Sequence, residues 1–506
     1  MASKTNLLNQ AEFQNGSGPQ SSSAGFTLPA DSNPEAFDVY QAIHDQLQSN
    51  VDPFQNFASF VNVSMEHEAI QLIFESLNIN LADTSIYTAT AKIKKQIIHM
   101  AADLLHADFV PGSDDFIGTA TVGSSEAVML GILAHKQRWL NWYDALPSAQ
   151  KPKDGRVPNM IIGGAYQICW EKAYKYFEIA GLGDPSAGAE GLTFDPTLPP
   201  QDRCRIIPLE PKQRIVTAES IRACLASGQI DENTIVVNLV LGTTQTAEMD
   251  EIIEINQILK SYNDQREREA EARGETAYRI PIHVDAAFGG FLLPFTEPEL
   301  EWDFRASEVQ SINVSNHKFG QVLPGLGMVL FRDPSVVPPY LFSKINYLGE
   351  QFDDFGLNFS RSSWPIISQY YNFLRYGRAG YRRWAEEILS QANQLKSKLL
   401  AEAAYADYFE LLTEIGPATE DGQGASLRFP SLILRVKPSA PFSAKALSAA
   451  LASRGWLVPA YTLPPKLESV TVLRLVVKAH LNAEMIERFV EALTHSISDL
   501  CNHQPV

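Results

Sequence analysis

Residues 280–290 read Ile280-Pro-Ile-His-Val-Asp-Ala-Ala-Phe-Gly-Gly290, an apolar run that delivers one acid, Asp285, to a turn of small residues. A second stretch that reads as a buried strand, Gln310-Ser-Ile-Asn-Val314, leads into Ser315-Asn-His-Lys318 in the same way. A lysine amine can hold the aldehyde of pyridoxal phosphate as a Schiff base, and a carboxylate can keep the pyridine nitrogen protonated. The plainer alternatives are that Lys318 is a surface lysine and Asp285 a structural aspartate. Because both residues stand at the end of a predicted strand, we favour a pyridoxal phosphate site with Asp285 and Lys318 as catalytic residues.

The regions around these two runs predict an α/β fold. Short β-branched runs alternate with helical stretches between about 118 and 332, which is typical of a mostly parallel sheet with helices on both faces. The predicted strands are 160–162, 235–240, 280–284, 311–314 and 328–331, with a smaller α+β unit formed by strands 432–436 and 470–477 and a helix at 485–497. We expect a flexible tail at 1–33, a helical arm at 34–110, a large domain at 111–385 and a small domain at 386–506.

Composition narrows the class of protein. The 506 residues are 45% hydrophobic, enough to bury a large core, and 59 acidic against 41 basic residues give a net charge of −18. This balance disfavours nucleic acid and anionic membranes as partners. The four cysteines have neither metal-ligand spacing nor the density of a disulfide framework, and no signal peptide or long apolar run is evident. We expect a cytoplasmic protein that acts on a small molecule and holds no metal.

A third motif lies at 118–126, where small residues and the hydroxyls of Ser124 and Ser125 lead directly into an apolar helix. The free N–H groups at a helix start, together with the positive end of the helix dipole, suit a phosphate group. An ordinary helix cap is the plainer alternative for this motif alone.

These motifs, with two others, closely resemble those of the glutamate decarboxylases of bacteria and plants, which are group II pyridoxal phosphate decarboxylases. The similarity extends in the same order from about residue 53 to residue 499. The resemblance implies the aspartate aminotransferase-like fold, also called fold type I of pyridoxal phosphate enzymes. The matching stretches are 123–131, 167–170, 283–291, 315–320 and 358–361.

The resemblance also implies a cofactor site shared between subunits of a homodimer or a higher even-numbered homo-oligomer. Gln167 would lie against the pyridine ring as a further catalytic residue, Ala287 would pack on the other face, and Thr244 would bond near the ring hydroxyl or Asp285. Ser360 would reach the phosphate from the neighbouring subunit. The remaining phosphate ligands would be Ser124, Ser125, Ser315 and His317; taken alone, His317 reads as a hydrogen-bonded core histidine.

For the substrate, the resemblance implies that Arg474 grips the α-carboxylate. Only the Cα bond held perpendicular to the cofactor ring can pass its electrons into the ring, so this grip selects loss of CO₂. Tyr347 aligns with a tyrosine that reprotonates Cα and favours an amine product. Asp83 beside a second carboxylate requires a shared proton, which favours activity below neutral pH. The other implied substrate residues are Ser59, Phe60, Asn80, Phe288 and Phe359.

Two departures from the family pattern leave the substrate open. Phe288 stands where the family has serine and Asn316 where it has glycine. Glutamate remains first, with aspartate or cysteine sulfinate next; a biosynthetic enzyme that captures the decarboxylated carbanion, or an oxidative aldehyde synthase, is the alternative chemistry. A non-catalytic binding protein is disfavoured by intact Lys318, Asp285, Tyr347 and Arg474. We expect no calmodulin-binding tail after residue 499.

Overall fold

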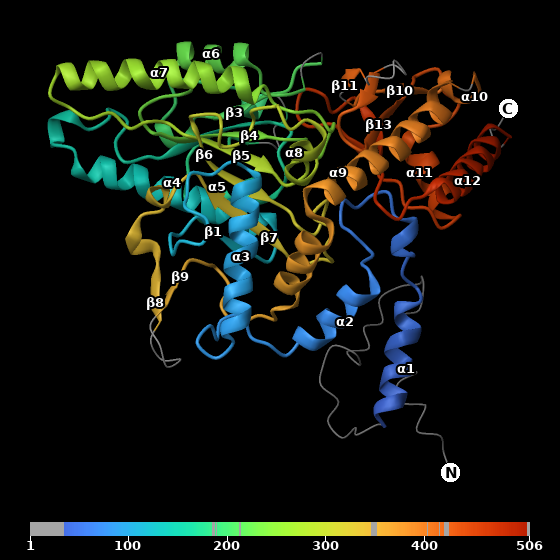
Figure 1. The fold of residues 1–506 in the computed structure, drawn as a ribbon. Coiled ribbons are helices and arrows are strands. Elements are labelled where there is room, and N and C mark those ends of the chain that lie inside the picture. Colours follow the sequence, from blue (N-terminus) through green and yellow to red (C-terminus); the bar gives the residue numbers. More distant parts are fainter. Residues whose placement is uncertain are drawn as a thin grey trace.

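The computed structural model describes residues 35–184, 188, 190–211, 214–345, 352–401, 403–413, 415–418 and 425–502. A seven-stranded sheet lies at its centre, in the order β1-β7-β6-β5-β4-β2-β3 (Figure 1). Strands β3, β2, β4, β5 and β6 run parallel, and β7 runs antiparallel to both β6 and β1. The strand bounds are β1 (Gly118–Thr121), β2 (Asn159–Gly163), β3 (Ile206–Ile207), β4 (Thr234–Val240), β5 (Ile282–Ala286), β6 (Val309–Val314) and β7 (Gly327–Phe331).

The composition of the strands explains why the sheet is covered on both faces. Every residue of β4 and β5 is buried, as expected for parallel strands between two helical layers. Figure 1 shows α6 (Ala218–Ser227) and α7 (Ile252–Ala272) along one side of the sheet. Helix α4 (Ser124–Ala145) packs against β6 and β7, and α5 (Cys169–Tyr176) packs on α4. The predicted mostly parallel sheet is confirmed, while β1 and β3 were not anticipated as strands.

A second, antiparallel sheet forms the smaller unit near the C-terminus, in the order β10-β13-β15-β14. The 38-residue helix α9 (Trp364–Ala401) joins the two sheets and is kinked at Gly377, whose φ is 54°. The predicted boundary between residues 385 and 386 lies inside this helix. The unit contains β10 (Phe409–Leu411), β13 (Ser431–Val436), β14 (Ala460–Thr462), β15 (Thr471–Val476), α10 (Ala403–Ala406), α11 (Ala444–Ala452) and α12 (Ala483–Asn502), beside the hairpin of β11 (Ile415–Ala418) and β12 (Ala425–Leu427).

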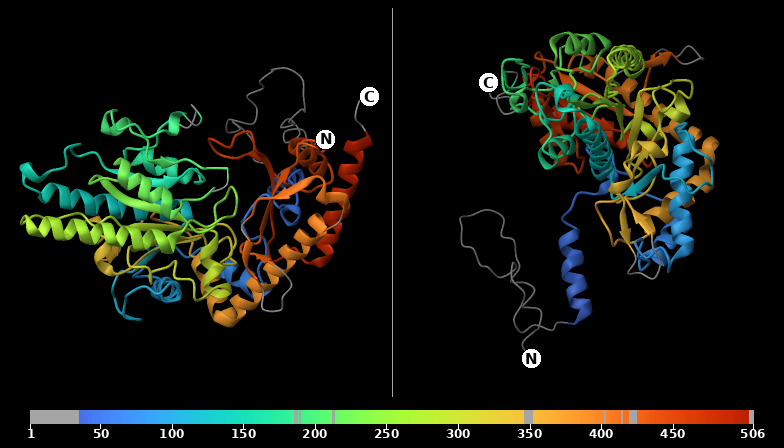
Figure 2. Two further views of the ribbon diagram at one scale, coloured as in Figure 1. Left: turned by 90° about the horizontal axis from the view of Figure 1, so that it is seen from above. Right: turned by 90° about the vertical axis from the view of Figure 1, so that its left-hand side faces the viewer.

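Three helices form the N-terminal part. Helices α2 (His67–Ser76) and α3 (Thr88–Leu104) pack on α9, whereas α1 (Ala36–Leu47) has no buried residue and stands apart from the body (Figures 1 and 2). A short hairpin of β8 (Ser343–Ile345) and β9 (Phe352–Asp354) precedes α9. The expected tail at 1–33 and Tyr347 lie outside the described residues. Across the described ranges, no helix is both long and apolar enough to cross a membrane.

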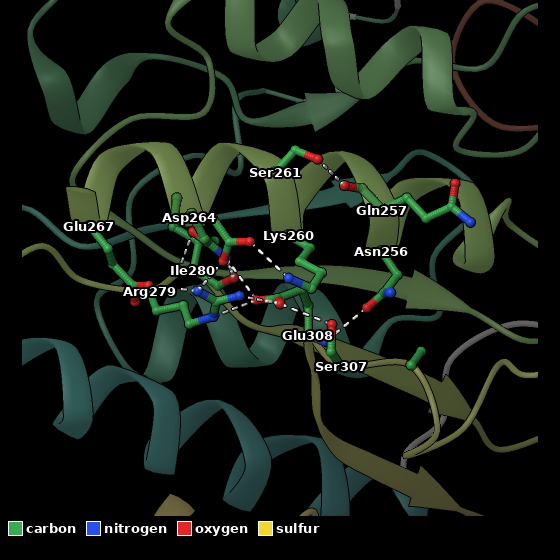
Figure 3. Close-up of polar contacts among 12 residues, drawn as sticks. Asn256, Gln257, Lys260, Ser261, Asp264, Glu267, Arg279, Ile280, Ser307 and Glu308 are labelled. Carbon is green, nitrogen blue, oxygen red and sulfur yellow. Dashed lines mark hydrogen bonds and ion pairs between the residues drawn. The ribbon is translucent and has the colours of Figure 1, made fainter. Parts of the chain in front are cut away.

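Ion pairs fasten the amino ends of β5 and β6. Arg279 contacts Glu308 at 2.6 Å, Asp264 at 2.9 Å and Glu267 at 2.8 Å, which ties α7 to the start of both strands (Figure 3). Glu308 is buried and also accepts a hydrogen bond from Asn263 at 2.9 Å. Asp264 and Glu267 of the highly charged stretch 264–277 therefore take part in structural ion pairs. Arg279 and Glu308 precede β5 and β6, whereas Asp285 and Lys318 lie at or beyond the carboxyl ends of these strands. The ion-pair network therefore lies at the opposite end of the two strands from Asp285 and Lys318.

Candidate active site

A cavity of about 160 Å³ opens at the carboxyl ends of β4 and β5. In parallel α/β sheets this edge is the usual place for a ligand, because the strand ends and helix starts converge there. The structure brings most of the predicted cofactor residues to this one cavity. It is lined by Ser124, Ser125, Gln167, Thr244, Asp285, Ala287, His317 and Lys318, together with Phe60 and Phe288 on the predicted substrate side and Ala165, Cys169, Val240 and Gly242.

Lys318 lies in the wall of this cavity with its amine 5.3 Å from the centre of the Phe60 ring. Burial lowers the pKa of Lys318, an effect opposed by the nearby charge of Asp285. A lowered pKa leaves a larger fraction of the amine neutral at a given pH, and only the neutral amine is nucleophilic. Lys318 is therefore suited to attack an aldehyde.

Asp285 is held by donors on both of its oxygens. Trp170 donates from Nε1 to Oδ2 at 3.0 Å, while Asn313 donates from Nδ2 to Oδ1 at 2.8 Å and the Ala287 N–H donates to Oδ1 at 3.2 Å. These hydrogen bonds fix the carboxylate in orientation and stabilise its negative charge. An ionised and oriented carboxylate is the partner that a protonated pyridine nitrogen requires.

The opposite end of the cavity has the features of a phosphate site. Helix α4 begins at Ser124, and a Cβ added to Gly123 would lie 3.1 Å from Cε1 of His317, so the helix start and the histidine approach closely. His317 accepts the Gly325 N–H at Nδ1 (3.4 Å), which leaves the proton on Nε2, 3.0 Å from Ser315 Oγ. Burial, assisted by Lys318, lowers the pKa of His317 to about 4, so its ring is a neutral donor near pH 7.

Arg474 reaches the same region from β15 of the smaller unit. Its guanidinium donates to the carbonyl oxygens of Thr244 (3.0 Å) and Ala58 (2.8 Å) and lies over the rings of Phe60 (4.9 Å) and Tyr461 (5.4 Å). Its Nε is buried and has no hydrogen-bond partner among the described residues. Leaving a buried donor unpaired costs about 1–3 kcal/mol, a penalty that a bound substrate carboxylate would remove.

Four predicted residues form a second group that does not line the cavity. Asn80 Nδ2 lies 3.1 Å from Asp83 Oδ2 and 3.4 Å from Ser360 Oγ, and the neighbouring Phe359 is 36% exposed. Ser59, in contrast, directly precedes Phe60 and accepts the Val61 N–H at 3.1 Å. Within one chain, the residues expected around the distal carboxylate are thus divided between the cavity and the surface.

Several residues of the site were missed by sequence reasoning. Trp170 lies in a motif that was recognised, but a tryptophan on an amphipathic helix is more often a core residue. Tyr461 and Asn313 gave no motif signal, although Asn313 follows Ser311 at the two-residue spacing that shares a strand face. Cys169 lines the cavity, and burial raises the pKa of its thiol to about 12, so it stays uncharged.

Comparison of this chain with known proteins supports the interpretation of the cavity as the site of a cofactor bound by a lysine. The pyridoxal-dependent decarboxylase conserved domain matches residues 19–418. The chain belongs to the pyridoxal-dependent decarboxylase family, and its cofactor is pyridoxal phosphate. The expected family and the expected fold type I are thereby confirmed.

Individual relatives cover nearly the whole chain. It is 35% identical over 464 residues to the glutamate decarboxylase beta of Listeria monocytogenes, covering 92% of this chain and 88% of the relative. It is 35% identical over 482 residues to the glutamate decarboxylase of Solanum lycopersicum, covering 95% and 84%. The solved glutamate decarboxylase of Lactobacillus brevis superposes with a TM-score of 0.79 at 31% identity, covering 94% and 96%. The tryptophan decarboxylase of Catharanthus roseus, at 16% identity and a TM-score of 0.68, shares the fold.

Proposed function

We propose that this chain is an α-decarboxylase that converts glutamate to 4-aminobutyrate and CO₂. Lys318 and Asp285 line one cavity, and Arg474, whose buried Nε has no partner among the described residues, lies over the Phe60 ring of the same cavity; this arrangement supports the activity. The residues present fit pyridoxal phosphate, since an amine, an anchored carboxylate and a helix start with hydroxyls line a single cavity. The glutamate decarboxylases among the relatives support the choice of substrate.

Each side chain has a separate task in this proposal. Lys318 binds the cofactor covalently, Asp285 holds a proton at the pyridine nitrogen, and Ser124, Ser125 and His317 bind the phosphate. When bound, pyridoxal phosphate supplies the electron sink for the pair released from the Cα–carboxylate bond. Arg474 would bind and orient the substrate α-carboxylate, and the aromatic wall at Phe60 would keep water away from it.

The second group of residues supports a shared site. Ser360, Asn80 and Asp83 lie together outside the cavity of their own chain, with Ser360 exposed. We propose that the active unit is a homodimer in which this group completes the partner's site. We further propose that Tyr347, 13 positions before Ser360 in the sequence, supplies the proton at Cα. We also propose a cytoplasmic location, which the free thiols of all four cysteines support.

The substrate is tested by measuring CO₂ release and the amine product, by mass spectrometry, from a panel of amino acids. Glutamate should give the highest kcat/KM, above aspartate and cysteine sulfinate and well above leucine and phenylalanine. An aldehyde in place of the amine would contradict simple decarboxylation. A preference for an apolar or aromatic amino acid would contradict the acidic pocket.

Asp83→Ala should lower kcat/KM for glutamate by about ten- to hundredfold, the loss expected for a hydrogen bond to a charged group. The effect should be confined to acidic substrates, because Asp83 is proposed to share a proton with the distal carboxylate. Asp202→Ala, on an exposed turn, is the control and should leave kcat/KM unchanged. An equal loss with a non-acidic substrate would remove Asp83 from the substrate pocket.

Asp285→Asn should keep the cofactor bound at saturating concentration and lower kcat by at least about a hundredfold. A neutral amide cannot stabilise the protonated pyridine nitrogen, so the electron sink becomes weaker. Cofactor content is read from visible absorption and kcat from CO₂ release under saturating glutamate. A kcat within a few-fold of the wild-type value would show that Asp285 has another task.

A further inference from the structure

A continuous chain of buried polar side chains leads away from Asp285 into the core. His283 and Asp285 on β5 pair in register with Ser311 and Asn313 on β6, so all four side chains share one face of the sheet. Asn313 bonds both Asp285 (2.8 Å) and His283 (2.8 Å). Ser311 Oγ then bridges Nδ1 of His283 (2.6 Å) and Nε2 of His135 (2.7 Å).

The position of His135 on α4 depends on a close approach between the helix and the sheet. Gly131 lies one turn before His135, and a Cβ added to it would come within 2.9 Å of Cε1 of His283. Both histidines, Ser311 and Asn313 are completely buried. Four polar residues in the core are costly unless they bond each other, so their arrangement is a specific structural feature.

The hydrogen bonds of this chain have one direction. Nδ2 of Asn313 donates to the Asp285 carboxylate, so its Oδ1 must accept from Nε2 of His283. The neutral His283 ring then accepts at Nδ1 from the Ser311 hydroxyl, whose oxygen accepts from Nε2 of His135. Nδ1 of His135 is buried without a partner in the described part of the chain, which ends the series.

Burial supports the neutral form of both rings. It lowers the pKa of His283, where the hydrogen bond to Asn313 and the charge of Asp285 oppose the effect. It also lowers the pKa of His135, an effect that nearby Arg138 and His283 reinforce. Every donor in the series consequently points toward Asp285.

We propose that Asn313, His283, Ser311 and His135 are positioning residues that orient the Asp285 carboxylate toward the cofactor nitrogen. His283 fixes the amide of Asn313, since a flipped amide would place its oxygen against the carboxylate oxygen and lose the bond to His283. Ser311 and His135 in turn fix the tautomer of His283. This inference rests on the proposed role of Asp285 and adds the residues that act through it.

The central test is Asn313→Asp, which puts a second carboxylate against Asp285 in a side chain of nearly the same shape. Two close carboxylates must share a proton, so Asp285 is no longer fully ionised. Titration of the apo-protein with pyridoxal phosphate should show binding at least about tenfold weaker than in the wild type. The absorption maximum of bound cofactor should shift, and kcat should fall with little change in KM.

Asn263→Asp is the matched control. Asn263 is equally buried and donates to the buried carboxylate of Glu308 at 2.9 Å, in the ion-pair network of Figure 3 at the other end of the strands. This variant creates the same carboxylate pair away from the cavity and should keep cofactor affinity within about twofold of the wild type. Thermal unfolding of both variants measures the loss of stability that each exchange causes.

Ser311→Ala is the second variant, because it removes only one hydroxyl and leaves the packing intact. It should weaken cofactor binding by between about two- and tenfold, less than Asn313→Asp, since it acts through His283. The proposal would be overturned if both variants bound the cofactor as tightly as the wild type. It would also be overturned if the loss of cofactor affinity in each variant, including Asn263→Asp, were simply proportional to its loss of thermal stability. A wild-type protein that binds no pyridoxal phosphate would instead overturn the cofactor assignment and the positioning role together.

Discussion

Lys318→Ala should abolish decarboxylation, with a rate lowered by more than about ten-thousandfold. The reason is that the variant lacks the amine that binds the cofactor covalently, and no other amine among the described residues of the cavity can replace it. The variant should also lose the visible absorption of the covalently bound cofactor. In the wild type, borohydride should attach the cofactor permanently to the peptide that contains Lys318. Peptide mass spectrometry identifies the modified lysine directly.

Lys478→Met provides the control for this experiment. Lys478 is 3% exposed, burial lowers its pKa to about 8, and its amine has no hydrogen-bond partner among the described residues. It therefore shares the unusual ionisation of Lys318 but does not line the cavity. Lys478→Met should keep the absorption and the activity, and a cofactor found on Lys478 instead of Lys318 would contradict the assignment.

The central sheet and its cofactor edge were predictable because their signals are local. Ile and Val recur along both β5 and β6, and Asp285 and Lys318 lie at or just beyond the carboxyl ends of these strands. The same signal missed β1 and β3, since Gly118–Thr121 contains no large apolar residue and Ile206–Ile207 is too short to recognise. The kink of α9 was likewise not predictable, because Gly377 is a single glycine inside a strong helical pattern.

Contacts between distant parts of the chain were not predictable from spacing. Arg474 reaches the carbonyl oxygens of Ala58 and Thr244, which lie 416 and 230 positions away. Its orientation depends on the docking of the smaller unit onto the sheet, for which the sequence carries no local pattern. The role of Asn313 similarly depends on the register between β5 and β6, because a shift of one residue would point its side chain to the other face.

The division of the predicted substrate residues has a physical consequence for assembly. Phe60 lines the cavity of its own chain and Arg474 lies over the Phe60 ring, while Asn80 bonds both Asp83 and Ser360 elsewhere. If all of them serve one substrate, two chains must contribute to each site, and the interface must be isologous. Glu126 strengthens this reading, since its side chain accepts the N–H groups of Val122, beside the phosphate end of its own cavity, and of Leu357, beside the surface group. Within one chain, Glu126 thus links the cavity to the surface group.

Mixing Lys318→Ala protein with Tyr347→Phe protein should restore amine formation, although each variant alone is poor at it. In a heterodimer, one site takes its lysine from the Tyr347→Phe chain and its tyrosine from the Lys318→Ala chain, so it is intact. The other site carries both lesions. With random pairing of equal amounts, half of the dimers are mixed, and about a quarter of all sites should be active.

The experiment requires dissociation and reassociation of the chains, with subunit exchange verified by native mass spectrometry of differently tagged variants. A mixture prepared without dissociation is the control and should stay at the level of the separate variants. A double variant, Lys318→Ala with Tyr347→Phe, exchanged with an equal amount of wild type should lower activity to about half of its value before exchange, because each mixed dimer then has one lesion in each site. If exchange is verified and the mixture of single variants remains inactive, Lys318 and Tyr347 serve the same site from one chain, and the shared site is wrong.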